Sequence, residues 1–285
     1  MENSKKLGLL MIRGSGHSGF KRQALFMDRL EKKLARGGKD PGLVAHEVVD
    51  WYGPIQEQQE LILQRMKRAG IRLKSKLTRQ LIITNIGDLI NYGGKPGFPH
   101  YGYDETHRKV HKTILRLKNQ LPEDAPLLII ATSMGTEIIN DYILDRQKAA
   151  RDGSDDPLGN SPFERFETLT GLFTLGNNLP IFAASYQVDE IRPIEFPPPR
   201  LAPGLKEVAV WENYYDKNDS MGYPLKPLNT HFENLTSLRD ISINTGGPFS
   251  FWNFLSHFGY WRSRRLVKRL ASFIELLLDK EENRQ

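Results

Sequence analysis

The 285-residue sequence contains no cysteine. Neither disulfide bonds nor thiolate metal sites can therefore contribute to the protein, and the absence fits a reducing compartment. The sequence also has no apolar stretch that approaches the roughly 20 residues of a membrane-spanning helix. Its polar start, Met-Glu-Asn-Ser-Lys-Lys, is followed by an apolar run that is too short for a signal peptide. We therefore expect a cytoplasmic protein.

A strong excess of charge of one sign is missing as well. The formal net charge is +6 with 26% charged residues, which is too diffuse to predict a nucleic-acid partner. A hydrophobic content of 39% is typical of a soluble globular protein, and the length is sufficient for one large core. Because no internal repeat or linker stands out, we expect residues 1–285 to form a single domain.

The most informative stretch is 127–135, with the sequence Leu-Leu-Ile-Ile-Ala-Thr-Ser-Met-Gly. Its uncharged aliphatic start predicts a strand that is buried on both faces, as in a parallel sheet. Apolar residues at helical spacing follow directly over 138–143. A serine between a strand and a helix is the context of a nucleophile elbow, in which Ala131 and Gly135 supply the small residues that the sharp turn requires. An ordinary strand-to-helix turn is the alternative.

The remaining elements alternate between strands and helices along the chain. Strands are expected at 7–12, 43–51, 169–175, 208–215 and 240–244, and helices at 20–35, 56–68, 104–120 and 260–279. Segment 81–86 could be either. Leu25 is expected on the inner face of the first helix, and Ile62 and Met66 on one side of the second. The alternation predicts an α/β fold with a mostly parallel sheet and helices on both faces.

The segment from Pro180 to Pro203 is rich in proline and includes three in a row at 197–199. Such a segment cannot add a strand to the interior of a sheet. We expect it to cross one face of the domain as a lid or pocket wall.

A nucleophilic serine needs a base to accept its proton and an acid to orient that base. In α/β hydrolases the chain order is serine, acid, histidine. The two histidines after Ser133 are His231 and His257, and His257 lies between the last strand and the last helix, where the base is expected. The acid should follow the strand at 208–215, where Asp216 and Asp219 are both candidates.

Four sequence segments, in this order, resemble the serine lipase/esterase branch of the α/β-hydrolase family. They are Ala-Thr-Ser-Met-Gly at 131–135, Leu-Phe-Thr-Leu-Gly-Asn at 172–177, Asp219 with Tyr-Pro-Leu at 223–225, and Ser-His-Phe-Gly-Tyr-Trp at 256–261. The similarity extends over nearly the whole chain. It departs from the family at Arg13-Gly14, where His-Gly is frequent, and at Ala131, where glycine is usual.

The resemblance implies an α/β-hydrolase fold and a serine esterase that needs no cofactor and acts on a small-molecule or lipid ester. Ser133 would be the nucleophile, His257 the base and Asp219 the acid. Asp216 stays the alternative acid because it directly follows the strand. The amides of Met134 and Ser15 would form the oxyanion hole.

Two other classes of function stay open. One is a hydrolase-like fold without catalysis that acts as a binding or scaffold protein. The other is a dinucleotide-dependent oxidoreductase, since Gly14-x-Gly16-x-x-Gly19 follows a strand and precedes a helix. The acidic residue of that pattern would be Asp50, 31 positions after Gly19, whereas about 20 are expected.

Three further features are weaker. His107 and His111 have the spacing of a metal-ligand pair, but no third ligand is evident, and we expect both beside a basic, solvated helix face. Basic residues crowd the start of the last helix at 262–269. We favour a solvated face there, with weak contact to an anionic membrane surface as the alternative. Asp88 and Tyr92 are expected to make a structural hydrogen bond.

Overall fold

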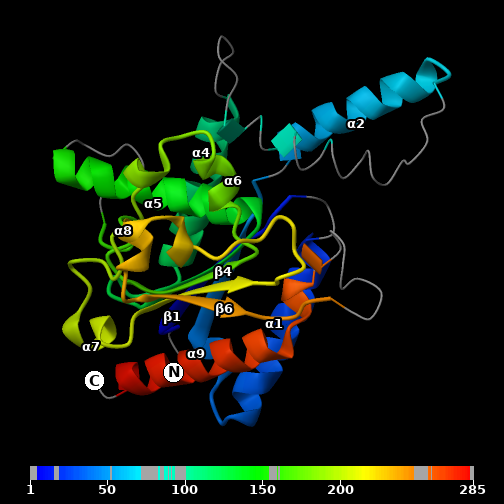
Figure 1. Cartoon of the computed structure of the whole chain (residues 1–285). Coiled ribbons are helices and arrows are strands. Elements are labelled where there is room, and N and C mark those ends of the chain that lie inside the picture. Colours follow the sequence, from blue (N-terminus) through cyan, green and yellow to red (C-terminus); the bar gives the residue numbers. More distant parts are fainter. Residues whose placement is uncertain are drawn as a thin grey trace.

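A computed structural model shows the arrangement of the chain (Figure 1). It describes residues 5–15, 19–51, 53–71, 83, 87–88, 90, 92–93, 101–153, 159, 161–246, 256–257 and 259–282. The segment 81–86, which the sequence left open, lies outside the described residues except for Ile83, which is helical.

Six strands form one parallel sheet in the order β2-β1-β3-β4-β5-β6. They are β1 (Leu7–Ile12), β2 (Val44–Val49), β3 (Leu127–Thr132), β4 (Leu169–Leu175), β5 (Val210–Tyr215) and β6 (Leu238–Ser242). All residues of β1, β3 and β4 are buried, because these central strands have helices on both faces. The α/β class with a parallel sheet is therefore confirmed.

In the part of the chain that the structure describes, five long helices accompany the sheet, together with short helical turns. The long helices are α1 (Gly19–Arg36), α2 (Gly53–Arg68), α4 (Tyr101–Lys118), α5 (Met134–Asp152) and α9 (Arg264–Glu282). The shorter ones are α6 (Leu179–Ala183), α7 (Pro203–Lys206), α8 (Thr230–Glu233), η1 (Pro41–Leu43), η2 (Val188–Glu190), η3 (Lys226–Leu228) and η5 (Tyr260–Arg262). Among the described residues, no helix is long and apolar enough to cross a membrane.

Side chains of alternate strand residues enter two separate cores. Leu10 and Ile12 of β1 pack on one face of the sheet with α4 and α5. Leu9 and Met11 pack on the other face with α1 and α9. Figure 1 shows α4 and α5 above the sheet and α1 and α9 below it. Because successive side chains of a strand point to opposite faces, a continuous run of aliphatic residues contributes to both cores.

The side chains of several helices differ from the expectation. Leu25 is 62% exposed, so the inner face of α1 consists of Phe26, Met27, Leu30 and Leu34 instead. On α2, Ile62 and Met66 are exposed as well. The spacing of apolar residues leaves the predicted buried face of a helix uncertain by one position. Packing against the rest of the fold decides which side of the helix is buried.

The proline-rich segment contains no strand in the structure, as expected, and part of it contacts the residues around the start of β5 and β6. Ser237, which precedes β6, donates a hydrogen bond of 2.9 Å to the carbonyl of Phe196. The aromatic ring of Phe196 packs against Trp211 near the start of β5. Ile194 and Phe196 are thus anchored at the amino-terminal edge of the sheet. α6, which directly follows β4, lies at the opposite edge.

The strand order reverses direction between β1 and β3. The chain runs from β1 outward to β2 and then returns to place β3 on the other side of β1, so that Ile12 lies opposite both Val49 and Ala131. In open parallel sheets the crevice at the carboxyl ends of two such strands is the usual ligand site. Here that crevice is bordered by Arg13-Gly14 after β1 and by Ser133 after β3.

The contact between α9 and the sheet gives the first prediction. Phe273 is fully buried and its ring meets Phe173 of β4 edge-on. Replacing Phe273 with alanine should lower the free energy of unfolding by about 3–5 kcal/mol, because it removes a packed ring and leaves a cavity. Leu276→Ala, at an exposed position of the same helix, should change it by no more than about 0.5 kcal/mol. Urea denaturation followed by circular dichroism measures both values, and equal losses would contradict this packing.

Candidate active site

Ser133 occupies the turn between β3 and α5 in an uncommon backbone conformation. Its φ is 51° and its ψ is −130°. Among the described residues, only Ser133 and Phe166 combine a side chain with a positive φ. The backbone N–H of Ser133 donates to the carbonyl of Leu175 on β4, at 2.9 Å. A residue with a Cβ atom adopts this region only at a cost, and such residues concentrate at functional sites.

Two glycines make this turn sterically feasible. A Cβ atom on Gly135 would lie 2.7 Å from the carbonyl oxygen of Arg13 and 2.8 Å from that of Ile12. A Cβ atom on Gly14 would lie 2.6 Å from the Cβ atom of Ser133. The turns after β1 and β3 are therefore pressed against each other, and neither could carry a larger residue at these positions without movement.

The structure brings together Ser133, His257 and Asp219, three residues from three separate loops. The Nε2 atom of His257 lies 2.7 Å from the Oγ atom of Ser133, and its Nδ1 atom lies 2.7 Å from the Oδ2 atom of Asp219. All three residues are buried. A hydroxyl, an imidazole and a carboxylate in this sequence of contacts can move a proton from the serine to the histidine while the carboxylate fixes the orientation of the ring.

Asp219 is held by several donors besides His257. Its Oδ1 atom accepts a hydrogen bond from the amide of Met221, at 2.9 Å, and its Oδ2 atom accepts one from the hydroxyl of Tyr260, at 2.8 Å. Gly176 and Gly222 approach the same carboxylate so closely that a Cβ atom on either would contact it. The carboxylate is therefore confined between the loops that follow β4 and β5.

Asp216, the alternative acid, has a different set of contacts. Its carboxylate accepts hydrogen bonds from the amides of Asn218 and Thr245 and from both of their side chains. Burial alone would raise the pKa of Asp216, but these donors outweigh burial and lower the pKa below its ordinary value. The single hydroxyl proton of Thr245 is shared between Asp216, at 2.9 Å, and the carbonyl of Ser256, at 2.6 Å. Thr245 therefore connects the loop after β5 that carries both carboxylates (216–222, the acid loop) with the segment next to His257.

Tyr260 was quoted in the sequence motif but not assigned a contact. Its hydroxyl accepts a hydrogen bond from the amide of Asp216, at 2.9 Å, and donates to Asp219. Burial and the charge of Asp219 raise the pKa of Tyr260, so the hydroxyl stays protonated as a donor. Its position three residues after His257 is the only sequence signal for this role.

The residues expected to stabilise an oxyanion lie at the same edge. Met134 is the first residue of α5, so its N–H has no acceptor within the helix and lies at the positive end of the helix dipole. Ser15 directly follows Gly14 and is half-buried. The side chain of Ser15 bonds to Asp88, which also accepts from Gln59 at 2.8 Å. Burial raises the pKa of Asp88 to about 6. Asp88 is thus tied to the loop after β1.

Asp88 and Tyr92 thus both make structural hydrogen bonds, but to different partners. The hydroxyl of Tyr92 contacts the Nε2 atom of His107 and donates to Asp141, at 3.1 and 3.0 Å. His107 is buried, not solvated as expected, and burial lowers its pKa to about 4. His111 lies 3.3 Å from the hydroxyl of Tyr142. In the part of the chain that the structure describes, no group of three potential ligands could hold a metal ion.

The other residues that the sequence singled out lie away from Ser133 or make contacts of another kind. His231 is on α8 beside Arg192 and does not contact Ser133. Asp50, the acidic residue of the dinucleotide pattern, accepts a hydrogen bond from Arg13 at 2.7 Å. Gly16 of that pattern lies outside the described residues. Among the basic residues of α9, Arg269 is paired with the buried Glu212, at 2.8 Å, whereas Arg264 and Arg265 are exposed.

Comparison of the chain with protein-family models, curated proteins and solved structures finds no match. The chemistry of the site must therefore be argued from its own geometry.

The contacts of Asp216 give a second prediction. Asp216→Asn should lower the free energy of unfolding at pH 7 by about 1–3 kcal/mol, because an amide nitrogen cannot accept the bonds that the carboxylate accepts. Since the folded pKa of Asp216 is lowered, its ionised form stabilises the protein above the unfolded value near 3.8, and this contribution is lost as the pH falls through the folded pKa. The difference between the wild type and the variant, measured by denaturation at several pH values, should shrink below pH 4. A difference that is constant with pH would contradict this role.

Proposed function

We propose that this chain is a serine hydrolase of the α/β-hydrolase fold that cleaves a carboxylic ester through an acyl-enzyme. The observation that carries the proposal is the pair of hydrogen bonds, 2.7 Å each, that join His257 to Ser133 and to Asp219. The strained conformation of Ser133 at the end of a buried strand supports it, as does the chain order of serine, acid and histidine.

In the first half of the reaction, the Oγ atom of Ser133 attacks the ester carbonyl while the Nε2 atom of His257 accepts its proton. The negative charge that develops on the carbonyl oxygen is stabilised by the amides of Met134 and Ser15. The bond to the alcohol then breaks, and the imidazolium returns the proton to the leaving oxygen. Asp219 keeps the Nδ1 atom protonated and stabilises the imidazolium.

In the second half, water replaces the alcohol. His257 removes a proton from the water as it attacks the acyl-serine, and the carboxylic acid leaves as Ser133 regains its proton. Protein side chains and backbone amides supply every group in this sequence, so the proposed reaction needs no cofactor.

The two other classes of function have less support. A chain that only binds a partner would need neither a strained serine nor a bond between its hydroxyl and an imidazole. In the dinucleotide pattern Gly14 would serve a tight turn, whereas here the absence of a Cβ atom at Gly14 makes room for Ser133. The acidic residue of the pattern, Asp50, accepts a hydrogen bond from Arg13. Titration with nicotinamide dinucleotides tests the oxidoreductase alternative directly.

The third prediction concerns Ser133. Replacing Ser133 with alanine should abolish labelling by a fluorophosphonate probe and lower ester turnover by about four orders of magnitude or more, since the nucleophile is lost. Ser220→Ala, which changes an exposed serine of the acid loop, serves as the matched control and should keep both activities. Gel fluorescence and a panel of nitrophenyl esters measure the effects. Full labelling of Ser133→Ala would refute the assignment.

The fourth prediction distinguishes the two carboxylates. Asp219→Asn should lower kcat by about 10⁴-fold, because an amide favours the wrong tautomer of His257. Asp216→Asn should lower kcat by no more than about tenfold at a temperature where it stays folded, because it leaves the bond between Asp219 and His257 in place. Steady-state kinetics on a soluble ester, with circular dichroism as the folding control, give the ranking. The reverse ranking would assign the acid to Asp216.

A further inference from the structure

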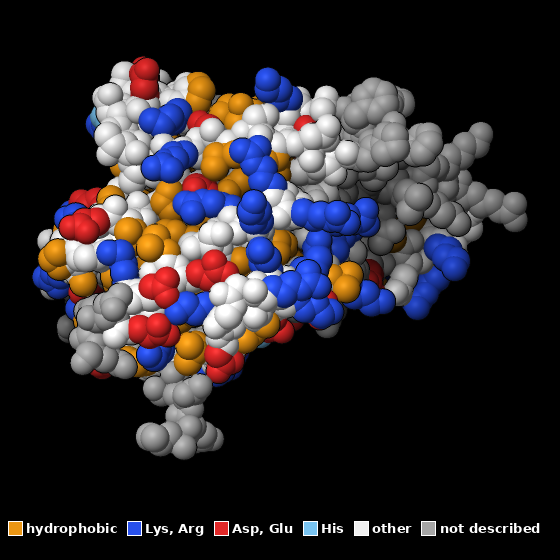
Figure 2. Space-filling view, turned by 90° about the horizontal axis from the view of Figure 1, so that it is seen from below, with side chains coloured by type: hydrophobic (Ala, Val, Ile, Leu, Met, Phe, Trp, Pro, Cys, Tyr) orange, Lys and Arg blue, Asp and Glu red, His pale blue; other side chains and the backbone are white. Residues whose placement is uncertain are grey.

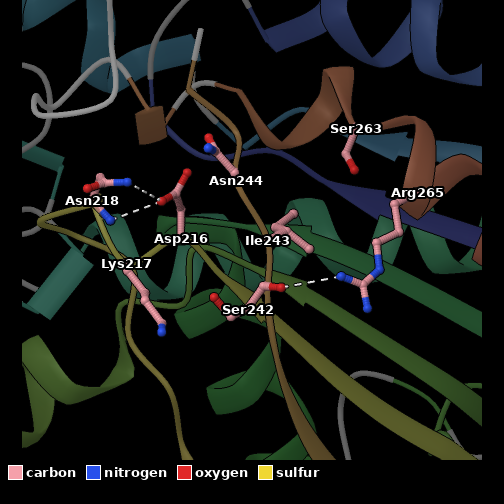
Figure 3. A pocket seen from close by; sticks show the side chains of 8 residues that line it. All are labelled: Asp216, Lys217, Asn218, Ser242, Ile243, Asn244, Ser263 and Arg265. Carbon is pink, nitrogen blue, oxygen red and sulfur yellow. Dashed lines mark hydrogen bonds between the residues drawn. The ribbon is translucent and has the colours of Figure 1, made fainter. Parts of the chain in front are cut away.

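A cavity of about 350 Å³ lies beside the loop that carries the proposed acid (Figure 3). Three segments line it: the loop after β5, the end of β6 with the residues that follow, and the start of α9. The lining residues are Asp216, Lys217, Asn218, Ser242, Ile243, Asn244, Ser263 and Arg265. The volume is at the small end of the range for sites that bind small molecules.

The two cationic side chains of the cavity have few contacts of their own. Lys217 forms no ion pair or side-chain hydrogen bond with any residue that the structure describes. Arg265 donates one long bond, 3.5 Å, to the carbonyl of Ser242. Figure 3 shows the ammonium group of Lys217 and the guanidinium group of Arg265 on opposite sides of Ser242. Most of their donors are thus available to a ligand.

Asp216 is the one acidic lining residue, so the two cations exceed it by one charge. Asp216 is 2% exposed, and its two oxygens already accept four hydrogen bonds from Asn218 and Thr245. Neutral donors add to the two cations. The oxygen of the Asn244 amide accepts from Gly246, which leaves its nitrogen to donate, and the hydroxyl of Ser263 accepts from Leu266 and can donate its proton.

The surrounding surface is positive as well. Arg262 and Arg264 neighbour the cavity in sequence, and the first turn of α9 has no acidic residue. Figure 2, which views the molecule from below, shows many Lys and Arg side chains interspersed with hydrophobic and acidic ones on the lower face. Such a field raises the local concentration of anions and speeds their association.

We propose that this cavity is a binding site for the phosphate group of a phosphomonoester. Lys217 would act as a point charge, and Arg265 would bind two phosphate oxygens at once. Asn244 and Ser263 would donate to the remaining oxygens. A phosphate offers three terminal oxygens and up to two negative charges, whereas a carboxylate offers two oxygens and one charge, so a phosphate can use more of these donors.

A short series of hydrogen bonds connects the cavity with the proposed active site. Lys217 directly follows Asp216, whose amide donates to Tyr260, and Tyr260 donates to Asp219. A ligand that bridges Lys217 and Arg265 would therefore fix the acid loop against α9. This coupling rests on the proposed function, whereas binding itself does not.

The experiment is calorimetric titration with inorganic phosphate and with glycerol 3-phosphate, at constant ionic strength in sodium chloride. We expect saturable one-to-one binding that weakens at least about tenfold in the double variant Lys217→Ala/Arg265→Ala. The control, Lys33→Ala/Lys206→Ala, removes two exposed cations elsewhere and should bind as the wild type does. Circular dichroism verifies that both double variants are folded.

A second arm identifies the source of the phosphate group. Co-sedimentation with vesicles of phosphatidylcholine, with and without phosphatidic acid, tests a lipid phosphomonoester by the same pair of variants. Binding of either source that depends on Lys217 and Arg265 supports the site. Absence of binding to both sources, or equal binding by the two double variants, overturns it. Titration of Ser133→Ala separates the proposals, because phosphate binding should persist in that variant even if the ester hydrolase assignment fails.

Discussion

The position of the Ser133 hydroxyl depends on the absence of two Cβ atoms. Gly14 and Gly135 allow the turns after β1 and β3 to touch, and this contact lets the backbone at Ser133 turn sharply at the carboxyl edge of the sheet. The hydrophobic sheet beneath supplies the force that holds the turns together, since β1 and β3 are buried along their whole lengths. The imidazole of His257 can then reach the serine from the far side of the crevice. The core thus holds the two turns in contact, and this contact positions the serine for the proposed chemistry.

Much of the fold could be predicted from the sequence because strongly buried strands leave a clear pattern. The limits of β1, β3 and β4 agree within a residue, as each is an uncharged, largely aliphatic run followed by a polar residue or glycine. The edge strand β6 was expected two residues too late, since its exposed residues give a weak pattern. The exposed Leu25 and the anchoring of the proline-rich segment at the amino-terminal edge depend on tertiary packing, and residue spacing contains no information about it.

The candidate site was predictable to the extent that chain order determines it. Ser133, His257 and Asp219 each follow a strand of a parallel sheet, and the ends of such strands meet at one edge. The distinction between Asp216 and Asp219 was not predictable from spacing, because both lie in one short loop. The two carboxylates differ in their contacts, since Asp219 contacts His257 and Tyr260 whereas Asp216 contacts Thr245. Spacing alone does not reveal these contacts. The bond of Ser15 to Asp88 likewise joins residues far apart in the chain.

The backbone conformation of Ser133 also sets a balance between stability and reactivity. A side chain in a sparsely populated region of backbone dihedral space costs on the order of 1–3 kcal/mol, and the rest of the fold must supply that free energy. Glycine would relieve this strain at position 133 without any other change in the chain. A sequence under selection for stability alone would therefore carry glycine there. The serine at this position lowers the stability of the fold and provides a hydroxyl that points out of the sheet. Stabilising changes elsewhere in the core would therefore let the site tolerate further substitutions.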